Sequence, residues 1–194
     1  LVLATPTAVM AAIGQATKHG VIIKSGEALE KMGKVDTIAF DKTGTLTYGR
    51  LDVSDVISFD SSVSETELLS LAASAESRSE HPLGKAIVAC AKIKEVPLSE
   101  TSSFKMTAGR GVFAATGSRS LLCGNESFLS ENKVPIDDRI RSTLEQLRAQ
   151  GKASVLIAED RKCIGVIALS DVLRPEAKNM VSRLSDMRTR TVLL

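Results

Sequence analysis

The chain has 194 residues, enough for one or two domains, and its 43% hydrophobic and 25% charged residues are the balance of an ordinary globular protein. The formal net charge is only +2, and the chain has no Trp and one Tyr, so neither charge nor base stacking favours a nucleic-acid partner. The three cysteines are scattered without a CxxC pair, which favours free thiols over a disulfide framework or a zinc site.

The first stretch, residues 1–13, is apolar and rich in small residues. It is too short to span a bilayer by itself. Its pattern fits two interpretations equally: a buried helix of a soluble domain, or the cytosolic half of a membrane helix that begins upstream. Residues 15–34 predict a basic helical segment that leads into the next domain. Both ends of the chain interrupt a pattern, so we expect a fragment.

The most informative stretch is residues 35–47, where an apolar β-run ends in Asp41 and continues as Lys-Thr-Gly-Thr-Leu-Thr. An aspartate at the carboxyl end of a strand lies at the edge where open α/β sheets place reactive groups. Its carboxylate can attack a phosphoryl group, while Gly44 allows a close turn around the phosphate. A lone Asp after a strand would favour an ordinary turn, but the complete string DKTGTLT is too specific for that interpretation.

This string resembles the phosphorylation signature of P-type ATPases, and the resemblance implies that Asp41 is the phosphorylated residue. It further implies a catalytic role for Lys42 and Thr43, and Mg²⁺ bound by Asp41 and the backbone carbonyl of Thr43. Soluble phosphatases of the same haloacid-dehalogenase-like fold usually carry a second Asp, the general acid, two residues after the nucleophile. Thr43 occupies that position here, which favours a persistent phosphoaspartate and therefore a pump.

The rest of the chain alternates predicted strands and helices. Ser64 lies at capping-box spacing from Glu67 and predicts a helix over 65–75, and Pro82 predicts the start of another helix. The remaining predicted elements, in chain order, are a strand over 51–59, the second helix over 82–94, a strand-like run over 104–116, a strand ending at 121–125, a helix over 137–150, a hairpin of strands 153–158 and 163–169, a helix over 176–187 and a strand over 191–194.

Several motifs of this part are similar to the nucleotide-binding domain of heavy-metal P-type ATPases. The string SEHPLGKAI carries the SEHP signature, and a Gly-x-Gly and a Gly-Asn pair follow it in the order of that family. Singly, each has an ordinary interpretation as a helix start, a β-bulge or an N-cap. Together they imply an ATP site with Glu76 on the adenine and His81 on the nucleotide. The implied nucleotide-binding residues are Glu76, His81, Gly109, Gly111, Gly124 and Asn125.

A further motif, Asp171-Val-Leu-Arg174-Pro-Glu, resembles the D-x-x-R-P-E motif of the same family. The resemblance implies that Asp171 and Arg174 take part in phosphate or nucleotide chemistry near the interface of the two domains. The ordinary alternative is an N-capping Asp and a surface Arg before a helix that begins with Pro.

The N-terminal string LATPTAVM resembles the sequence after the metal-binding Cys-Pro-Cys motif of heavy-metal P-type ATPases. The resemblance implies a partial transmembrane helix, a lipid membrane and a transported metal cation as partners, and a multi-pass protein of a bacterial or archaeal plasma membrane with most of this chain cytoplasmic. The transported-ion site would lie outside the chain. Leu1-Val2-Leu3 before ATPT looks less like copper exporters, which favours zinc, cadmium or lead.

The sequence thus predicts an α/β haloacid-dehalogenase-like (Rossmann-like) phosphorylation domain, incomplete, with an inserted α+β nucleotide-binding domain. The predicted divisions are 1–33 for the membrane and connecting helices, 34–57 and 165–194 for the phosphorylation domain, and 58–164 for the nucleotide-binding domain. The expected activity is ATP-driven metal export through an aspartyl phosphate. The alternatives are a soluble phosphatase of the same fold and a fragment that only binds nucleotide.

Overall fold

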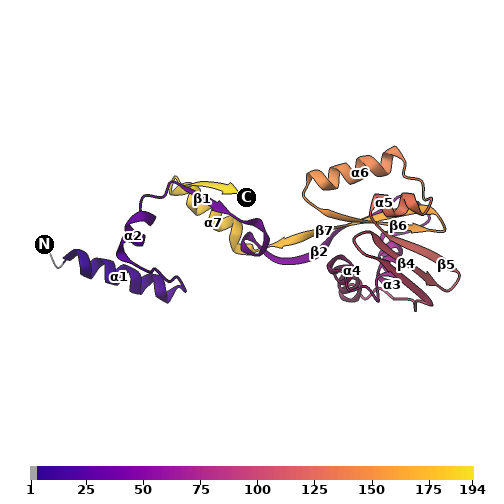
Figure 1. Cartoon of the computed structure of the whole chain (residues 1–194), viewed down its shortest axis with the longest axis horizontal. Helices are drawn as coiled ribbons and strands as arrows, with labels where there is room; N and C mark the ends of the chain where they lie inside the picture. The colour runs from indigo at the N-terminus through magenta and orange to yellow at the C-terminus, as the bar shows by residue number, and fades with distance from the viewer. Residues whose placement is uncertain (1–3) are drawn as a thin grey trace. The chain divides into compact units, whose positions relative to one another are not determined.

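The computed structural model describes residues 4–194 and divides the chain into two compact units (Figure 1). One unit combines the segment up to Leu46 with Arg174–Leu194, and the other is the insertion Thr47–Leu173. The sequence placed the boundaries of the insertion at 58 and 164. Those positions fall within two long strands, β2 (Thr47–Ser58) and β7 (Lys162–Leu173). The two strands pair with each other, and both lie wholly within the insertion.

The first unit begins with two helices, α1 (Ala4–Lys18) and α2 (Gly26–Met32). Ser25 caps α2 by accepting a hydrogen bond from the backbone N–H of Ala28 at 3.1 Å. Within residues 4–194, no helix combines the length and the apolar character needed to cross a membrane. The predicted membrane segment begins with residues 1–3, and these same residues favoured zinc, cadmium or lead. They lie outside the described part of the chain.

The first unit also holds a pair of parallel strands, β1 (Thr37–Phe40) and β8 (Arg190–Leu193), with the helix α7 (Pro175–Asp186) preceding β8. Pro175 occupies the first turn of α7, where its missing N–H costs no hydrogen bond. The parallel pairing places Asp41 directly after the carboxyl end of β1, as the sequence predicted.

The insertion is a six-stranded antiparallel sheet with helices on both faces (Figure 1). Its strand order is β2-β7-β6-β5-β4-β3. The strands between β2 and β7 are β3 (Ser103–Thr107), β4 (Gly111–Thr116), β5 (Arg119–Gly124) and β6 (Ala153–Glu159), and the helices are α3 (Glu65–Ala75), α4 (Pro82–Ile93), α5 (Glu126–Glu131) and α6 (Asp138–Ala149).

The alternation of side chains along the central strands creates two separate hydrophobic cores. Ile167 and Leu169 of β7 pack in the core formed with α3 and α4, whereas Val166 and Ala168 pack in the core formed with α5 and α6. The predicted helix starts are confirmed: Ser64 accepts from Glu67 N at 3.1 Å before α3. These caps fix where the helices begin, and the sheet fixes which face each one covers.

Candidate functional site

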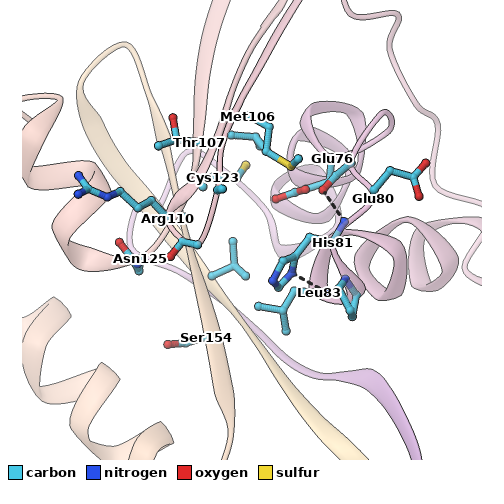
Figure 2. A pocket seen from close by; sticks show the side chains of 18 residues that line it. Glu76, Glu80, His81, Leu83, Met106, Thr107, Arg110, Cys123, Asn125 and Ser154 are labelled. Atoms are coloured by element: carbon cyan, nitrogen blue, oxygen red, sulfur yellow. Dashed lines mark hydrogen bonds between the residues drawn. The ribbon is translucent and has the colours of Figure 1, made fainter.

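A pocket of about 440 Å³ lies in the insertion, between the end of α3, the start of α4, the β3–β4 turn and the ends of β5 and β6 (Figure 2). Glu76 and His81 lie on one side of it, and Arg110 and Asn125 lie on the other. The six residues that the sequence motifs assigned to a nucleotide all line this pocket: Glu76, His81, Gly109, Gly111, Gly124 and Asn125.

His81 both caps the helix α4 and lines the pocket. It is the N-cap of α4, and its Nδ1 accepts a hydrogen bond from the backbone N–H of Leu83 at 3.2 Å. Because Nδ1 accepts, a neutral imidazole carries its proton on Nε2. The ordinary interpretation of this histidine as a helix start is therefore confirmed, and the same ring offers an N–H donor to a ligand.

Glu76 is a buried acid at the carboxyl end of α3, only 6% exposed. Its Oε2 has no hydrogen-bond partner within the described residues. Burial raises the pKa of Glu76, while the hydroxyl of Ser79 and the nearby His81 act in the opposite direction. A buried acceptor without a partner costs free energy until a donor reaches it, so Oε2 is a natural contact for a ligand's N–H group.

Gly111 and Gly124 face each other across β4 and β5, and neither position has room for a side chain. A Cβ on Gly111 would lie 2.3 Å from the carbonyl oxygen of Cys123, and one on Gly124 would lie 2.5 Å from the carbonyl oxygen of Arg110. Gly109 has a φ of +71°, which the tight turn between β3 and β4 requires. The glycines leave this wall of the pocket as bare backbone, which a flat ligand can approach closely.

Asn125 ties this glycine wall together. Its Oδ1 accepts from Phe128 N at 2.9 Å and so caps α5, its Nδ2 donates to the Gly109 carbonyl at 3.3 Å, and its backbone N–H donates to the Arg110 carbonyl at 2.9 Å. The Arg110 side chain forms an ion pair with Glu131. The Gly-Asn pair is thus both an N-cap and a brace for the Gly-x-Gly turn.

Several pocket residues were missed by the sequence motifs. Ser79 lies inside the SEHP string, and its place in that string was the available signal. The strand residues gave no signal, because only the sheet register shows which of their side chains face the pocket. The residues missed include Ser79, Met106, Thr107, Cys123 and Ser154.

The loop after β1 is a tight turn built around Asp41. The backbone N–H of Thr43 donates to Asp41 Oδ1 at 3.3 Å. Thr43 (φ −77°, ψ 123°) and Gly44 (φ 77°, ψ −11°) have the dihedral angles of a type II turn, whose second central position requires glycine. The Arg174 guanidinium donates to the Gly44 carbonyl at 3.3 Å, so the side chain of this arginine stabilises the turn.

The Asp41 loop fits part of a magnesium site. Mg²⁺ prefers carboxylate and carbonyl oxygens, and it commonly takes only one or two carboxylates plus waters and phosphate oxygens. The exposed carboxylate of Asp41 and the carbonyl of Thr43 are donors of that kind. Within the described part of the chain, no group of three or more His, Cys, Asp or Glu side chains could hold a metal ion.

Asp171, to which the sequence assigned a role in phosphate chemistry, lies on β7 and does not line the pocket. Its Oδ2 accepts from Thr47 Oγ1 at 2.5 Å, and its Oδ1 accepts from the Arg50 backbone N–H at 3.1 Å. These contacts bridge the irregular start of β2, where the register with β7 shifts between Thr47 and Leu51. Its position therefore indicates support of the irregular start of β2, and its catalytic role stays a prediction.

Curated relatives are similar over almost the whole chain. Copper-exporting P-type ATPases of Staphylococcus aureus (strain bovine RF122 / ET3-1) and Staphylococcus haemolyticus (strain JCSC1435) are 38% and 39% identical over 192 residues, which cover 99% of this chain. The chain spans 23% of the length of these relatives.

Solved structures give the same picture. A zinc-transporting PIB-type ATPase in the E2.Pi state matches 97% of this chain at 34% identity, with a TM-score of 0.85 and 30% of its own chain covered. The catalytic domain of a CPx-ATPase, CopB-B, studied upon nucleotide binding, matches 93% of this chain at 28% identity and covers 62% of that chain, with a TM-score of 0.64. The names of the relatives include both copper and zinc, so the preference for zinc, cadmium or lead over copper is not supported.

Residues 35–194 match the family of haloacid dehalogenase-like hydrolases. This match covers most of the chain, and the predicted α/β class is confirmed with it. The similarity to heavy-metal P-type ATPases that the motifs predicted is confirmed by both the curated relatives and the solved structures. The chain therefore belongs to the haloacid dehalogenase-like hydrolases, and within them it is related to the heavy-metal P-type ATPases.

Proposed function

We propose that this chain binds ATP in the pocket of the insertion and accepts its γ-phosphate on Asp41. One observation carries the proposal: six residues assigned from separate motifs, spread from Glu76 to Asn125, gather around one pocket. Chance placement of ordinary turns and caps would not bring them to the same cavity.

The pocket chemistry suits an adenine ring. The unpartnered Oε2 of Glu76 can accept from an exocyclic amine, and the Nε2–H of His81 can donate to a ring nitrogen or a phosphate oxygen. Apolar side chains such as Val112 and Leu83 line the pocket beside the glycine wall and can cover the faces of the base.

Phosphoryl transfer would use the groups of the Asp41 turn. An oxygen of the Asp41 carboxylate attacks the γ-phosphorus, the bond from that phosphorus to the β,γ-bridging oxygen breaks, and ADP leaves with the electron pair. Lys42 offsets the negative charge that gathers there. Mg²⁺, when held by the Asp41 carboxylate and the Thr43 carbonyl, supplies further charge neutralisation at the phosphate.

The whole protein that contains this segment would use the phosphorylation to export a heavy-metal cation across a membrane, with most of this segment on the cytoplasmic side. The names of the relatives support copper and zinc as the first candidates. The two are separated by measuring ATPase activity of the full-length protein with Cu⁺ or Zn²⁺ added. Stimulation by neither ion would overturn the proposed transport class.

The test of the nucleophile is Asp41→Asn, with Asp36→Asn as the matched control. Asp36 precedes β1, so it lies at the opposite end of the strand from Asp41. In the full-length protein incubated with [γ-³²P]ATP and quenched in acid, we expect Asp41→Asn to lose the phosphoenzyme and to keep ATP binding. Asp36→Asn should retain both. Normal ³²P incorporation in Asp41→Asn would exclude Asp41 as the nucleophile.

The same experiment separates the two alternatives. A soluble phosphatase would hydrolyse its phosphoaspartate quickly, so little phosphoenzyme would accumulate, and its phosphate release would not depend on a metal cation beyond Mg²⁺. A segment that only binds nucleotide would show ATP binding by calorimetry and no ³²P incorporation in any form of the protein.

A further inference from the structure

We propose that Arg110 recognises the phosphate groups of the nucleotide and that Glu131 lowers the affinity for them, because the phosphates must displace this carboxylate from the guanidinium. Glu131 is a positioning residue in this scheme, since it acts on the ligand through Arg110. The inference rests on the proposed nucleotide site. It goes beyond that site by naming the part of the ligand that the β3–β4 turn recognises, and a residue outside the pocket that sets the strength of the contact.

Arg110 is the cation of the pocket lining. Of the described residues that line the pocket, it carries the only permanent positive charge. The two carboxylic acids of the lining lie elsewhere: Glu76 follows α3, and the Glu80 carboxylate is already paired with Lys85 at 2.6 Å. A ligand with several negative charges therefore meets a permanently attractive side chain at one place on the lining, the β3–β4 turn.

The position of Arg110 fits the phosphate end of the ligand. Glu76, the proposed acceptor for the exocyclic amine, lies on one side of the pocket, and Arg110 lies on the other (Figure 2). A nucleotide whose base meets Glu76 has its sugar and phosphates directed away from that acid. The guanidinium presents a planar fork of N–H donors that matches phosphate oxygens, so the residue type suits the place.

The backbone of Arg110 is fixed on both sides, while its side chain is accessible. Its N–H donates to the Thr107 carbonyl at 3.1 Å, and its carbonyl accepts from the backbone N–H of Asn125 at 2.9 Å. The side chain itself is 49% exposed. The guanidinium can therefore exchange one partner for another by rotation about its side-chain bonds, without any change in the glycine turn that carries it.

Glu131, the last residue of α5, is the present partner of this guanidinium. Arg110 Nη1 donates to both of its carboxylate oxygens. The Glu131 side chain is 55% exposed and does not line the pocket, so its effect on a ligand passes through the arginine. Ion pairs with this exposure are weak, so a phosphate group can displace the carboxylate. The displacement should still lower the observed affinity, by about two- to fivefold.

The test measures binding of ATP and adenosine to the 194-residue chain by calorimetry, without added metal. We expect Arg110→Gln to bind ATP about tenfold more weakly, the lower end for a hydrogen bond between charged groups, and to bind adenosine like the wild type. Glu131→Gln should bind ATP about two- to fivefold more tightly, again with adenosine unchanged. Both changes should shrink as NaCl is added, because salt screens exposed charges.

Three further variants separate the contact from a general effect of charge. Glu126→Gln removes the same charge from the same helix, but Glu126 is paired with Arg141 at 3.6 Å, so the gain in ATP affinity should be absent. The double variant Arg110→Gln, Glu131→Gln should bind ATP as weakly as Arg110→Gln alone. Arg110→Lys keeps the charge without the fork of donors, so it should recover part of the lost affinity.

Each outcome decides a separate point. A wild-type chain that binds neither ATP nor adenosine would overturn the proposed nucleotide function and this inference with it. An Arg110→Gln loss of equal size for ATP and adenosine would overturn phosphate recognition and leave the nucleotide function standing. A Glu131→Gln gain that is missing, or that Glu126→Gln or the double variant shows in full, would overturn the role of Glu131. Both side chains are exposed, so these substitutions should leave the fold intact.

Discussion

At the scale of single residues, His81 shows how one side chain can serve the fold and the pocket together. Its Nδ1 satisfies a backbone N–H at the start of α4, and that bond determines which ring nitrogen carries the proton offered to the pocket. Structural and ligand-binding roles therefore cannot be separated by replacing His81 with Ala alone. A substitution that keeps the cap is needed.

We expect His81→Ala to lower the free energy of unfolding by about 1 kcal/mol through loss of the cap and to weaken ATP binding. His81→Asn restores a capping oxygen, so it should recover most of the stability and none of the affinity. Urea unfolding and calorimetry with ATP measure the two quantities. The matched control is His19→Ala, because His19 is exposed after α1 and does not line the pocket. Full ATP affinity in His81→Asn would argue against a ligand contact by the ring.

Glu76 predicts an unusual pH dependence of stability. Its folded-state pKa is raised above the usual value of 4.5, so its contribution is fully present below about pH 4.5 and is lost as the pH rises through the folded-state pKa. We expect Glu76→Gln to gain stability relative to the wild type over that rise, and to show no pH-dependent difference below it. Thermal or urea unfolding as a function of pH measures the effect.

The control for Glu76 is Asp55, whose pKa is lowered by the hydrogen bond and charge of Lys152 and by Ser54. Asp55→Asn should show the opposite sign: the wild type is the more stable protein above the unfolded-state pKa, and this advantage fades as the pH falls. Equal slopes for the two variants would contradict the assignment of the buried Glu76 as the group with the raised pKa.

At the scale of elements, the paired strands β2 and β7 form the double connection between the insertion and the Asp41 turn. Their register is broken between Thr47 and Leu51, and Gly49 in the break has a φ of +68°. Such a bulge leaves backbone groups without ladder partners. Asp171 supplies the missing acceptor for one of them, which is why its carboxylate lies there.

We expect Asp171→Ala to lower the free energy of unfolding by about 1–3 kcal/mol, since it leaves Thr47 Oγ1 and the Arg50 N–H without this acceptor. ATP affinity should remain, because Asp171 does not line the pocket. Asp52→Ala on the same strand pair removes only an exposed ion pair with Arg50 and should cost within about 0.5 kcal/mol. Urea unfolding separates the two variants, and equal losses would argue against the bridging role of Asp171.

At the scale of the whole molecule, all the pocket residues belong to the insertion and Asp41 belongs to the other unit. We therefore expect ATP to slow hydrogen exchange in the 76–84 segment, the β3–β4 turn and the end of β5, and to leave α1 unchanged. At an ATP concentration of 100 times the Kd, the added protection corresponds to about 2.7 kcal/mol. Exchange monitored by mass spectrometry measures this, and a uniform response of the whole chain would contradict the assignment of the pocket to the insertion.

Apart from the short α5 (Glu126–Glu131), which the sequence analysis did not predict, the helices of the insertion were predicted well because their boundaries are set by local chemistry. Ser64 and Asp137 cap α3 and α6 through hydrogen bonds to residues three positions ahead, and Gly151 follows α6 with a φ of +70°. Such signals need only a few neighbouring residues. The strands were predicted less well: β2 and β7 are each longer than expected, because each is extended by pairing with a partner more than a hundred residues away.

The sequence by itself determined local features of this protein: an aspartate after β1, a close turn at Gly44, and a set of motifs whose order indicated the family. These are properties of short strings, in which residue type and spacing carry the physical constraint. The metal ion was not determined in this way, since the residues used for it give no contact that selects an ion.

Only the tertiary structure decided how the motifs act together. It placed the glycines of β4 and β5 opposite each other and left Glu76 Oε2 buried without a hydrogen-bond partner among the described residues. It also showed that the Asp171 carboxylate bridges β7 to the start of β2. The physical reason is that strand register and burial depend on contacts between distant segments, which no local string of residues specifies.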